Sequence, residues 1–279
     1  MVRAHNGHKP ETEKMMRLPY ALFIAASLTA TSAAQSQGVD WQKVDEAIGR
    51  KPAVVFGEVH RYGFPRSDLN VTVDGVSIKP ASALGGWIGF DITAVHNHLL
   101  RANPPTFYMH VGGSGDPAKM AAAVRAALSE SKTPLAPSSP PAAAPAIDLD
   151  TGQLDQIIGV KGQANGGVYQ FAVPRRDPAT ENGMALAPAG PLGMATGIGF
   201  QPTGNGKAAI TGDFVMTADE SNPVIKALRA NDIEVTALHS HMLDEQPRLY
   251  FMHFWANDDA VKLAKGLRAA LDKMANAKS

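Results

Sequence analysis

Cysteine is absent from this chain of 279 residues. Its absence excludes disulfides, thiolate zinc sites, iron–sulfur clusters, cysteine nucleophiles and lipid attachment to an N-terminal cysteine. An excess of one charge is also absent, because 26 Lys and Arg residues balance 26 Asp and Glu residues. Phosphate neutralisation needs surplus positive charge, so we expect no nucleic-acid partner.

Several catalytic motifs are missing as well. The chain has no phosphate loop, no G-x-S-x-G elbow, no H-E-x-x-H and no dinucleotide fingerprint after a strand. A metal-free hydrolase would therefore lack a convincing nucleophile. The composition, with 44% hydrophobic and 19% charged residues, is typical of a folded protein of one large domain or two.

The N-terminus has the pattern of an export signal. Basic residues at 14 and 17 precede the apolar run Leu18–Ala34, which ends in small residues, with Ser32 and Ala34 at the −3 and −1 positions of a cleavage site. We predict a signal peptide over 1–34 and a location in the periplasm or outside the cell. After cleavage no stable membrane anchor would remain; the alternative is an uncleaved N-terminal anchor.

The chain contains an internal repeat. Thr93–Leu128 aligns without gaps to Thr236–Leu271 at an offset of 143, with 15 of 36 positions identical. Matches further upstream have an offset of 110, so the second copy holds 33 residues, roughly 201–233, that the first lacks. We expect a shortened first repeat over 35–131, a Pro/Ala-rich linker over 132–147 and a complete second repeat over 148–279.

The repeated unit predicts an α+β fold, a tandem duplication of an antiparallel hairpin sheet with helices packed on one side. The expected strands are 210–216, 234–243 and 248–256, with a turn at 244–247. The expected helices are 39–48, 154–158, one capped by Asn222 with Pro223 at its first position, and one capped by Asn257 and ending near Met274.

Histidines carry the strongest functional pattern. H-x-H-x11-H occurs once in each copy, as His239, His241 and His253 in the second. Residues two apart on a strand share a face, and a hairpin that sets Ala237 opposite His253 would bring the third histidine to that face. Three such imidazoles predict a site for Zn²⁺ or Cu²⁺. The weaker candidates are the first-copy counterparts, which are His96, His98 and His110.

A carboxylate could complete such a site. Asp213, Asp219 and Glu220 lie only in the 33 additional residues, and Glu220 is the favoured fourth ligand or general base. Catalytic residues are otherwise unknown, and no organic cofactor is indicated. The alternative for Asp219 and Glu220 is complementation of a helix dipole, and that for the histidines is a structural hydrogen-bonded network.

Two smaller features accompany the histidines. Arg66 with Asp68, and Arg175 with Asp177, form an Arg-x-Asp pair in each copy, which is either an ion pair or an anion grip. His60 stands alone and is expected to be an ordinary partly exposed histidine.

The second-copy segments "GDFVMTADESNPVIKALRANDIEVTALHSHML" and "RLYFMHFWANDDAVKLAKGLRAAL" resemble the LppY/LpqO family of exported bacterial proteins of unknown function. "TAVHNHLL" and "YMHVGG" in the first copy are similar to the same motifs. The resemblance implies a secreted or envelope location and brings no established activity. Two departures are the lack of a cysteine for acylation and the lack of the GDFV…NPV segment in the first copy.

Two hypotheses follow. In the first, an exported protein binds a divalent transition metal through the His-x-His…His cluster. In the second, a non-enzymatic envelope binding or scaffold module uses its histidines structurally. The sequence leaves open whether the protein is an enzyme and which small-molecule or envelope partner it has.

Overall fold

The computed structural model describes residues 38–55, 59–79, 85–86, 91–136, 146–186 and 194–275. The expected signal peptide over 1–34 and positions 137–145 of the expected linker lie outside these ranges. The chain divides into two compact units, Met1–Gly38 and Val39–Ser279, and the second unit holds both copies of the repeat.

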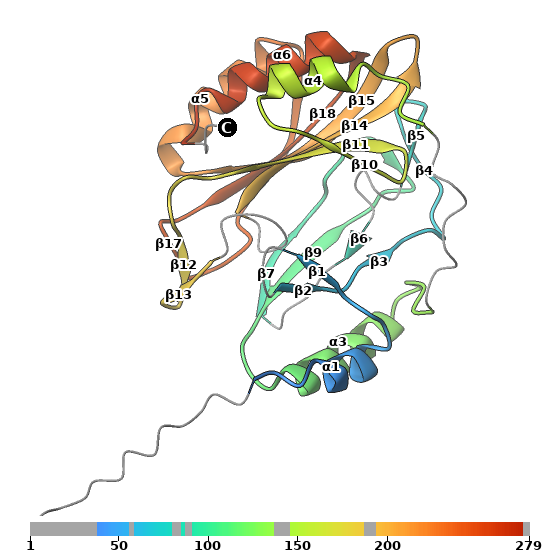
Figure 1. Cartoon of the computed structure of the whole chain (residues 1–279), viewed down its shortest axis with the longest axis vertical. Coiled ribbons are helices and arrows are strands. Elements are labelled where there is room, and N and C mark those ends of the chain that lie inside the picture. The colour runs from blue at the N-terminus through green and yellow to red at the C-terminus, as the bar shows by residue number, and fades with distance from the viewer. Residues whose placement is uncertain are drawn as a thin grey trace, which may run out of the picture. The chain divides into compact units, whose positions relative to one another are not determined.

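A six-stranded antiparallel sheet forms the centre of the second copy (Figure 1). Its strand order is β10 (Gln163–Asn165), β11 (Val168–Pro174), β14 (Ala195–Gly204), β15 (Lys207–Met216), β18 (Tyr250–Asp259) and β16 (Glu234–His239). Helices α4 (Thr151–Ile158), α5 (Ala218–Arg229) and α6 (Ala260–Leu271) cover one face. Phe200, Phe214 and Phe254 fill the core beneath them. These layers confirm the predicted α+β class.

The first copy is built from smaller pieces. Helices α1 (Trp41–Ile48) and α3 (Pro117–Ser129) pack together, and β7 (Asp91–His96) pairs with β9 (Tyr108–Gly112) as a two-stranded hairpin. The remaining strands are β1 (Ala53–Val55), β2 (Val59–Arg61), β3 (Phe64–Pro65), β4 (Val71–Val73), β5 (Val76–Ile78), β6 (Gly85–Gly86) and β8 (Ala102–Asn103). A further small sheet in the second copy joins β12 (Thr180–Glu181), β13 (Met184–Ala185) and β17 (Glu245–Gln246).

The two copies repeat local geometry as well as sequence. Helices α1 and α4 each begin at an aspartate cap and end at a left-handed glycine, Gly49 and Gly159, where a side chain would be strained. In the hairpins, Ala94 lies opposite His110 and Ala237 opposite His253. The predicted register of the second hairpin is therefore confirmed, and the first hairpin has the same one.

Several predicted boundaries are wrong. Helix α5 begins at Ala218 rather than after Asn222, because Thr217 and Glu220 form a reciprocal capping box that starts the helix earlier. Strand β16 ends at His239, short of the predicted end at 243, and the predicted turn over 244–247 contains β17. Strand β18 runs through the predicted cap Asn257 to Asp259, whose side chain caps α6.

The first copy packs against the sheet face that the helices leave uncovered. Val71 and Leu99 share a buried cluster with Trp255, which lies one residue beyond the helix-side Phe254 and therefore on the opposite face. Arg101 also forms an ion pair with Glu234 of β16 at 2.7 Å. The histidine-bearing strands of the two copies thus meet across one interface.

Candidate metal centre

All six repeat histidines meet in one cluster at this interface. In each copy the first histidine ends a strand, the second follows two residues later, and the third lies on the partner strand of the hairpin. The rings of His239 and His253 lie 5.0 Å apart by centroid, and those of His239 and His241 lie 4.9 Å apart. The three second-copy histidines therefore share a face, as the strand period predicts.

The cluster is nearly two-fold symmetric. His96 stacks on its own counterpart, His239, with ring centroids 3.6 Å apart. His98 stacks on His253 at 3.8 Å, and the exchanged pair, His110 and His241, lies at 4.0 Å.

The outer rings of the cluster obey the same symmetry. Tyr108 covers His98 at 3.5 Å, and its counterpart Phe251 covers His241 at 3.5 Å. The two copies thus contribute equivalent residues to a single site.

Two compact groups of ligand atoms lie in the cluster. Each group brings three imidazole nitrogens within 4.8 Å of one another, and each mixes the two copies: His96, His110 and His239 in one, and His96, His98 and His253 in the other. Sequence reasoning treated each triad as a site within its own copy, whereas the structure joins the triads. The signal for this joining was the duplication itself, since equivalent faces of related units tend to pair symmetrically.

The carboxylate at the cluster is Asp213 of β15. Its Oδ2 lies 3.4 Å from Nε2 of His241, and its Oδ1 lies 3.9 Å from Nδ1 of His253, the residue opposite it in the sheet. The sequence placed Asp213 in the additional segment but favoured Glu220. The register of β15 against β18 places Asp213, rather than Glu220, beside the histidines. This long-range strand pairing cannot be predicted from local sequence patterns.

Glu220 is engaged elsewhere. Its carboxylate accepts hydrogen bonds from the buried guanidinium of Arg175, with Nη1–Oε2 at 2.6 Å, and from the backbone N–H groups of Thr217 and Ala275. It belongs to neither histidine group. The favoured role as fourth ligand or base therefore finds no support in the geometry, and the helix-terminus alternative matches what is seen.

Burial keeps the imidazoles neutral. Desolvation is the main cause that lowers the pKa of His96 to about 4, of His110 to about 3 and of His239 to about 2, and neighbouring histidine charges lower these pKa values further. The pKa of His253 falls to about 4 from burial, partly offset by its hydrogen bond to a backbone carbonyl. Neutral imidazole is the form that ligates metals.

Several ring nitrogens in the cluster lack hydrogen bonds. Neither nitrogen of His239, nor Nδ1 of His96, nor Nε2 of His98 has a partner in the described part of the chain. His253 is oriented, because its Nδ1 donates to the carbonyl of Gly212 at 2.9 Å and leaves Nε2 directed at Nε2 of His96, 3.2 Å away. Such orientation by a second hydrogen bond is typical of metal-ligating histidine.

Asp213 is held in its neutral form by the same environment. Burial raises the pKa of this carboxyl to about 8, against a smaller lowering by a backbone hydrogen bond. This partly buried carboxyl, which lies beside neutral imidazoles, would become a ligand or base when a positive charge stabilises its ionised form. A divalent cation would supply that charge.

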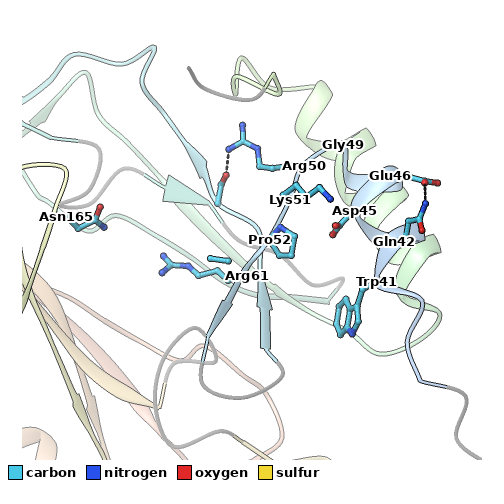
Figure 2. A pocket seen from close by; sticks show the side chains of 12 residues that line it. Trp41, Gln42, Asp45, Glu46, Gly49, Arg50, Lys51, Pro52, Arg61 and Asn165 are labelled. Atoms are coloured by element: carbon cyan, nitrogen blue, oxygen red, sulfur yellow. Dashed lines mark hydrogen bonds between the residues drawn. The ribbon is translucent and has the colours of Figure 1, made fainter. Parts of the chain in front are cut away.

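Other predicted features lie apart from the cluster. His60 stacks on Trp41 at 3.5 Å in the first copy. A cavity of about 1100 Å³ is lined by Trp41, Arg50 and Arg61 along α1 and the strands that follow it, and none of the six histidines lines it (Figure 2).

The Arg-x-Asp pairs are ion pairs in both copies, at 2.7 Å for Arg66 with Asp68 and 3.0 Å for Arg175 with Asp177. The first of these two arginines lines a smaller cavity beside the cluster.

Fold and site together define a class: a duplicated α+β protein whose halves share one histidine cluster. A model of the family described as Domain of Unknown Function (DUF1259) matches residues 42–91, 88–130 and 152–273, which together exceed half of the chain. The chain belongs to this family. Searches of curated proteins and of solved structures each found no match.

Proposed function

We propose that this protein binds a divalent transition metal ion, Zn²⁺ or Cu²⁺, within the six-histidine cluster. The observation that carries the proposal is the convergence of neutral imidazoles with unpaired ring nitrogens. Native interiors rarely leave buried polar atoms unpaired, and an ion is one of the few explanations for several at once. Imidazole nitrogens are preferred ligands of both metals.

Distances within the cluster support this reading. Ligand nitrogens of a tetrahedral zinc site lie roughly 3.3 Å apart, as follows from Zn–N bonds of about 2.0 Å. The Nε2 atoms of His96 and His253 are 3.2 Å apart. Asp213 would add a carboxylate to a site that otherwise has no negative charge. A metal bound here would polarise a coordinated water. The protein would either use that water for hydrolysis or only hold the metal.

The rival function is a scaffold or binding module in which the histidines only stack. The ring contacts favour it, since His96 and His239 lie face to face at 3.6 Å. It predicts that the cluster contributes to folding stability and that added metal leaves the melting temperature unchanged.

The test is metal content together with thermal unfolding. At free metal about 100 times the Kd, binding stabilises by about 2.7 kcal/mol and raises Tm by roughly 5 to 10 °C. We expect His96→Ala to abolish the shift, because His96 belongs to both ligand groups. The matched control is His60→Ala, which removes a stacked histidine outside the cluster and should keep the shift.

The metal proposal fails if purified protein, saturated with Zn²⁺ or Cu²⁺ and desalted, retains no metal and shows no change in Tm. It also fails if His96→Ala keeps the full shift. Either result would favour the rival function, a scaffold or binding module with structural histidines.

An exported location is part of the same proposal, supported by the signal-like N-terminus and by the resemblance to the LppY/LpqO family. In the described part of the chain, no helix has the length and apolar character needed to cross a membrane. Fractionation of cells, with N-terminal sequencing of the mature chain, tests the location and the predicted cleavage after Ala34.

A further inference from the structure

A pocket of about 400 Å³ opens beside the histidine cluster in the first copy. His98 and His110 form part of its wall, so a molecule in the pocket would lie next to the candidate metal centre. The rest of the wall is mostly apolar or aromatic and includes Phe64, Phe107 and Tyr108. Volume and lining match those of small-molecule sites, which are largely apolar with a few polar groups.

Arg66 is the one cation in the pocket wall described here. Its Nε and Nη2 donate to Asp68 at 2.8 and 2.7 Å. Its Nη1 makes no hydrogen bond within the described residues. A guanidinium presents five donors in a planar fork, so Arg66 retains donors for a second carboxylate.

The second copy shows what an arginine at this position binds. Arg66 comes directly after Pro65, which pairs with Gly85 across the strands. Arg175 comes directly after Pro174, which pairs with Ala195 in the same way, so the two arginines lie at equivalent strand ends. Arg175 also pairs with its neighbouring aspartate, through one hydrogen bond from Nη2 to Asp177 at 3.0 Å. It also binds a second carboxylate, which belongs to Glu220 of α5.

The first copy has no counterpart of Glu220. That residue lies in the 33-residue segment present only in the second copy. Glu220 stands between Arg175 and the backbone N–H of Ala275. The first-copy counterpart of Ala275 at the offset of 143 is position 132, and Thr133 lines the pocket. The pocket therefore occupies the place that a carboxylate of the chain occupies in the second copy.

We propose that this pocket binds a small aromatic carboxylate, whose carboxylate group pairs with Arg66 as Glu220 pairs with Arg175. The aromatic part packs against Phe64 and Tyr108. Binding at this place brings the ligand to the edge of His98 and His110. The inference goes beyond the proposed function, because neither the arginine nor the aromatic wall requires a metal.

Calorimetric titration of benzoate and phenylacetate into the metal-free protein tests the proposal, with benzamide as the uncharged analogue of benzoate. We expect saturable binding of at least one carboxylate and binding of benzamide weaker by about tenfold or more, since hydrogen bonds between charged groups are lost. Arg66→Met should weaken carboxylate binding by a similar factor. The pair it removes is at the surface, so folding should survive.

Two further variants keep the test sharp. Arg101→Met removes an arginine that pairs with Asp74 and Glu234 away from the pocket, and it should leave carboxylate binding unchanged. Phe107→Ala changes a side chain that is 75% exposed, so it leaves the core intact, and it should weaken binding several-fold without altering charge.

The proposal is overturned if neither carboxylate binds, if benzamide binds as tightly as benzoate, or if Arg66→Met matches the unaltered protein. Repeating the titration with Zn²⁺ present separates this result from the metal proposal. Carboxylate binding without any retained metal would support the pocket and contradict the metal site. Retained metal without carboxylate binding would support the metal site and contradict the pocket.

Discussion

Asp213 is the carboxyl group that lies against the histidine cluster. Its side chain keeps 24% of its surface exposed and lies beside two imidazoles that are themselves neutral. The pair with His241 is therefore a contact between uncharged groups rather than an ion pair. The carboxyl holds a proton that an incoming cation would displace, so metal binding at the cluster would release protons.

Asp213→Asn is expected to stabilise the metal-free protein at high pH. The folded-state pKa of about 8 lies above the unfolded value of 3.8, so Asp213 destabilises the fold increasingly as pH rises through this window. Asparagine removes the effect, which we expect to be about 1 to 3 kcal/mol at pH 8 after allowance for partial exposure. Urea unfolding in EDTA at pH 6 and pH 8 measures it, and the difference between the two proteins should be smaller at pH 6, which lies further below the folded-state pKa.

The matched control is Asp68→Asn, because a neighbouring arginine lowers the pKa of Asp68. It should bring no gain in stability at pH 8. In metal-loaded protein, Asp213→Asn should weaken metal affinity by about 10- to 100-fold, as for other groups that orient ligands. An Asp213→Asn protein that is less stable than the unaltered one at pH 8 in EDTA would contradict the assignment.

At the scale of elements, α5 is the piece that distinguishes the two copies. Its N-terminus joins three parts of the second copy through one carboxylate: Glu220 closes the capping box, neutralises Arg175 and accepts from the backbone of Ala275. The side chain of Arg175 is only 1% exposed. Glu220 is the more buried of the two carboxylates that compensate this charge, and Asp177 is the other.

Glu220→Gln should destabilise the protein without altering metal binding. Removing one partner of a buried ion pair costs about 3 to 5 kcal/mol when the remaining charge is uncompensated. The loss should lie near or below the lower end of this range, because Asp177 still pairs with Arg175. Denaturant unfolding measures the loss, and metal titration of the folded variant should give an unchanged affinity. A selective loss of metal affinity with full stability would restore the ligand role that the sequence suggested for Glu220.

The strands and helices also show which features of the fold can be predicted from local sequence patterns. Hairpin register was predictable, because a strand alternates faces and a slip by one residue would turn the third histidine away from the other two. The start of α5 was not, since two capping signals compete: Asn222 before Pro223, and Thr217 with Glu220. The structure follows the second pair and places Pro223 inside the helix. Only packing against Arg175 and the C-terminal segment, both distant in sequence, decides between them.

At the scale of the whole molecule, the site depends on contacts between copies that sequence spacing does not encode. The histidine pattern identified all six residues. It did not show that His96 meets its own counterpart or that β15 presents Asp213 to them. Both are long-range pairings set by the packing of one copy on the sheet of the other.

The metal-free protein should lose stability in mild acid. The six cluster histidines have folded-state pKa values below the ordinary value of 6.5, so the unfolded chain takes up protons that the folded chain excludes. The histidine contribution to stability is complete above pH 6.5 and is lost as pH drops towards about 4. Each histidine that stays neutral contributes a slope of up to roughly 1.4 kcal/mol per pH unit.

Urea unfolding in EDTA at pH 7.5, 6 and 5 checks this slope. His96→Asn, which removes one titrating ring, should make it shallower. Stability that stays constant between pH 7.5 and pH 5 would mean that the six rings are solvated and carry charge in the folded protein.

The self-pairing of His96 with His239 has a consequence for how such a site arises. A residue that meets its own equivalent lies on a two-fold axis, so a single unduplicated unit would assemble these imidazoles only as a homodimer with an isologous interface. Fusing the units in one chain replaces association between molecules by an effective concentration of about millimolar. The six histidines then come together whatever the protein concentration. One copy can also lose a segment, such as the 33 residues absent from the first copy, while the other keeps it.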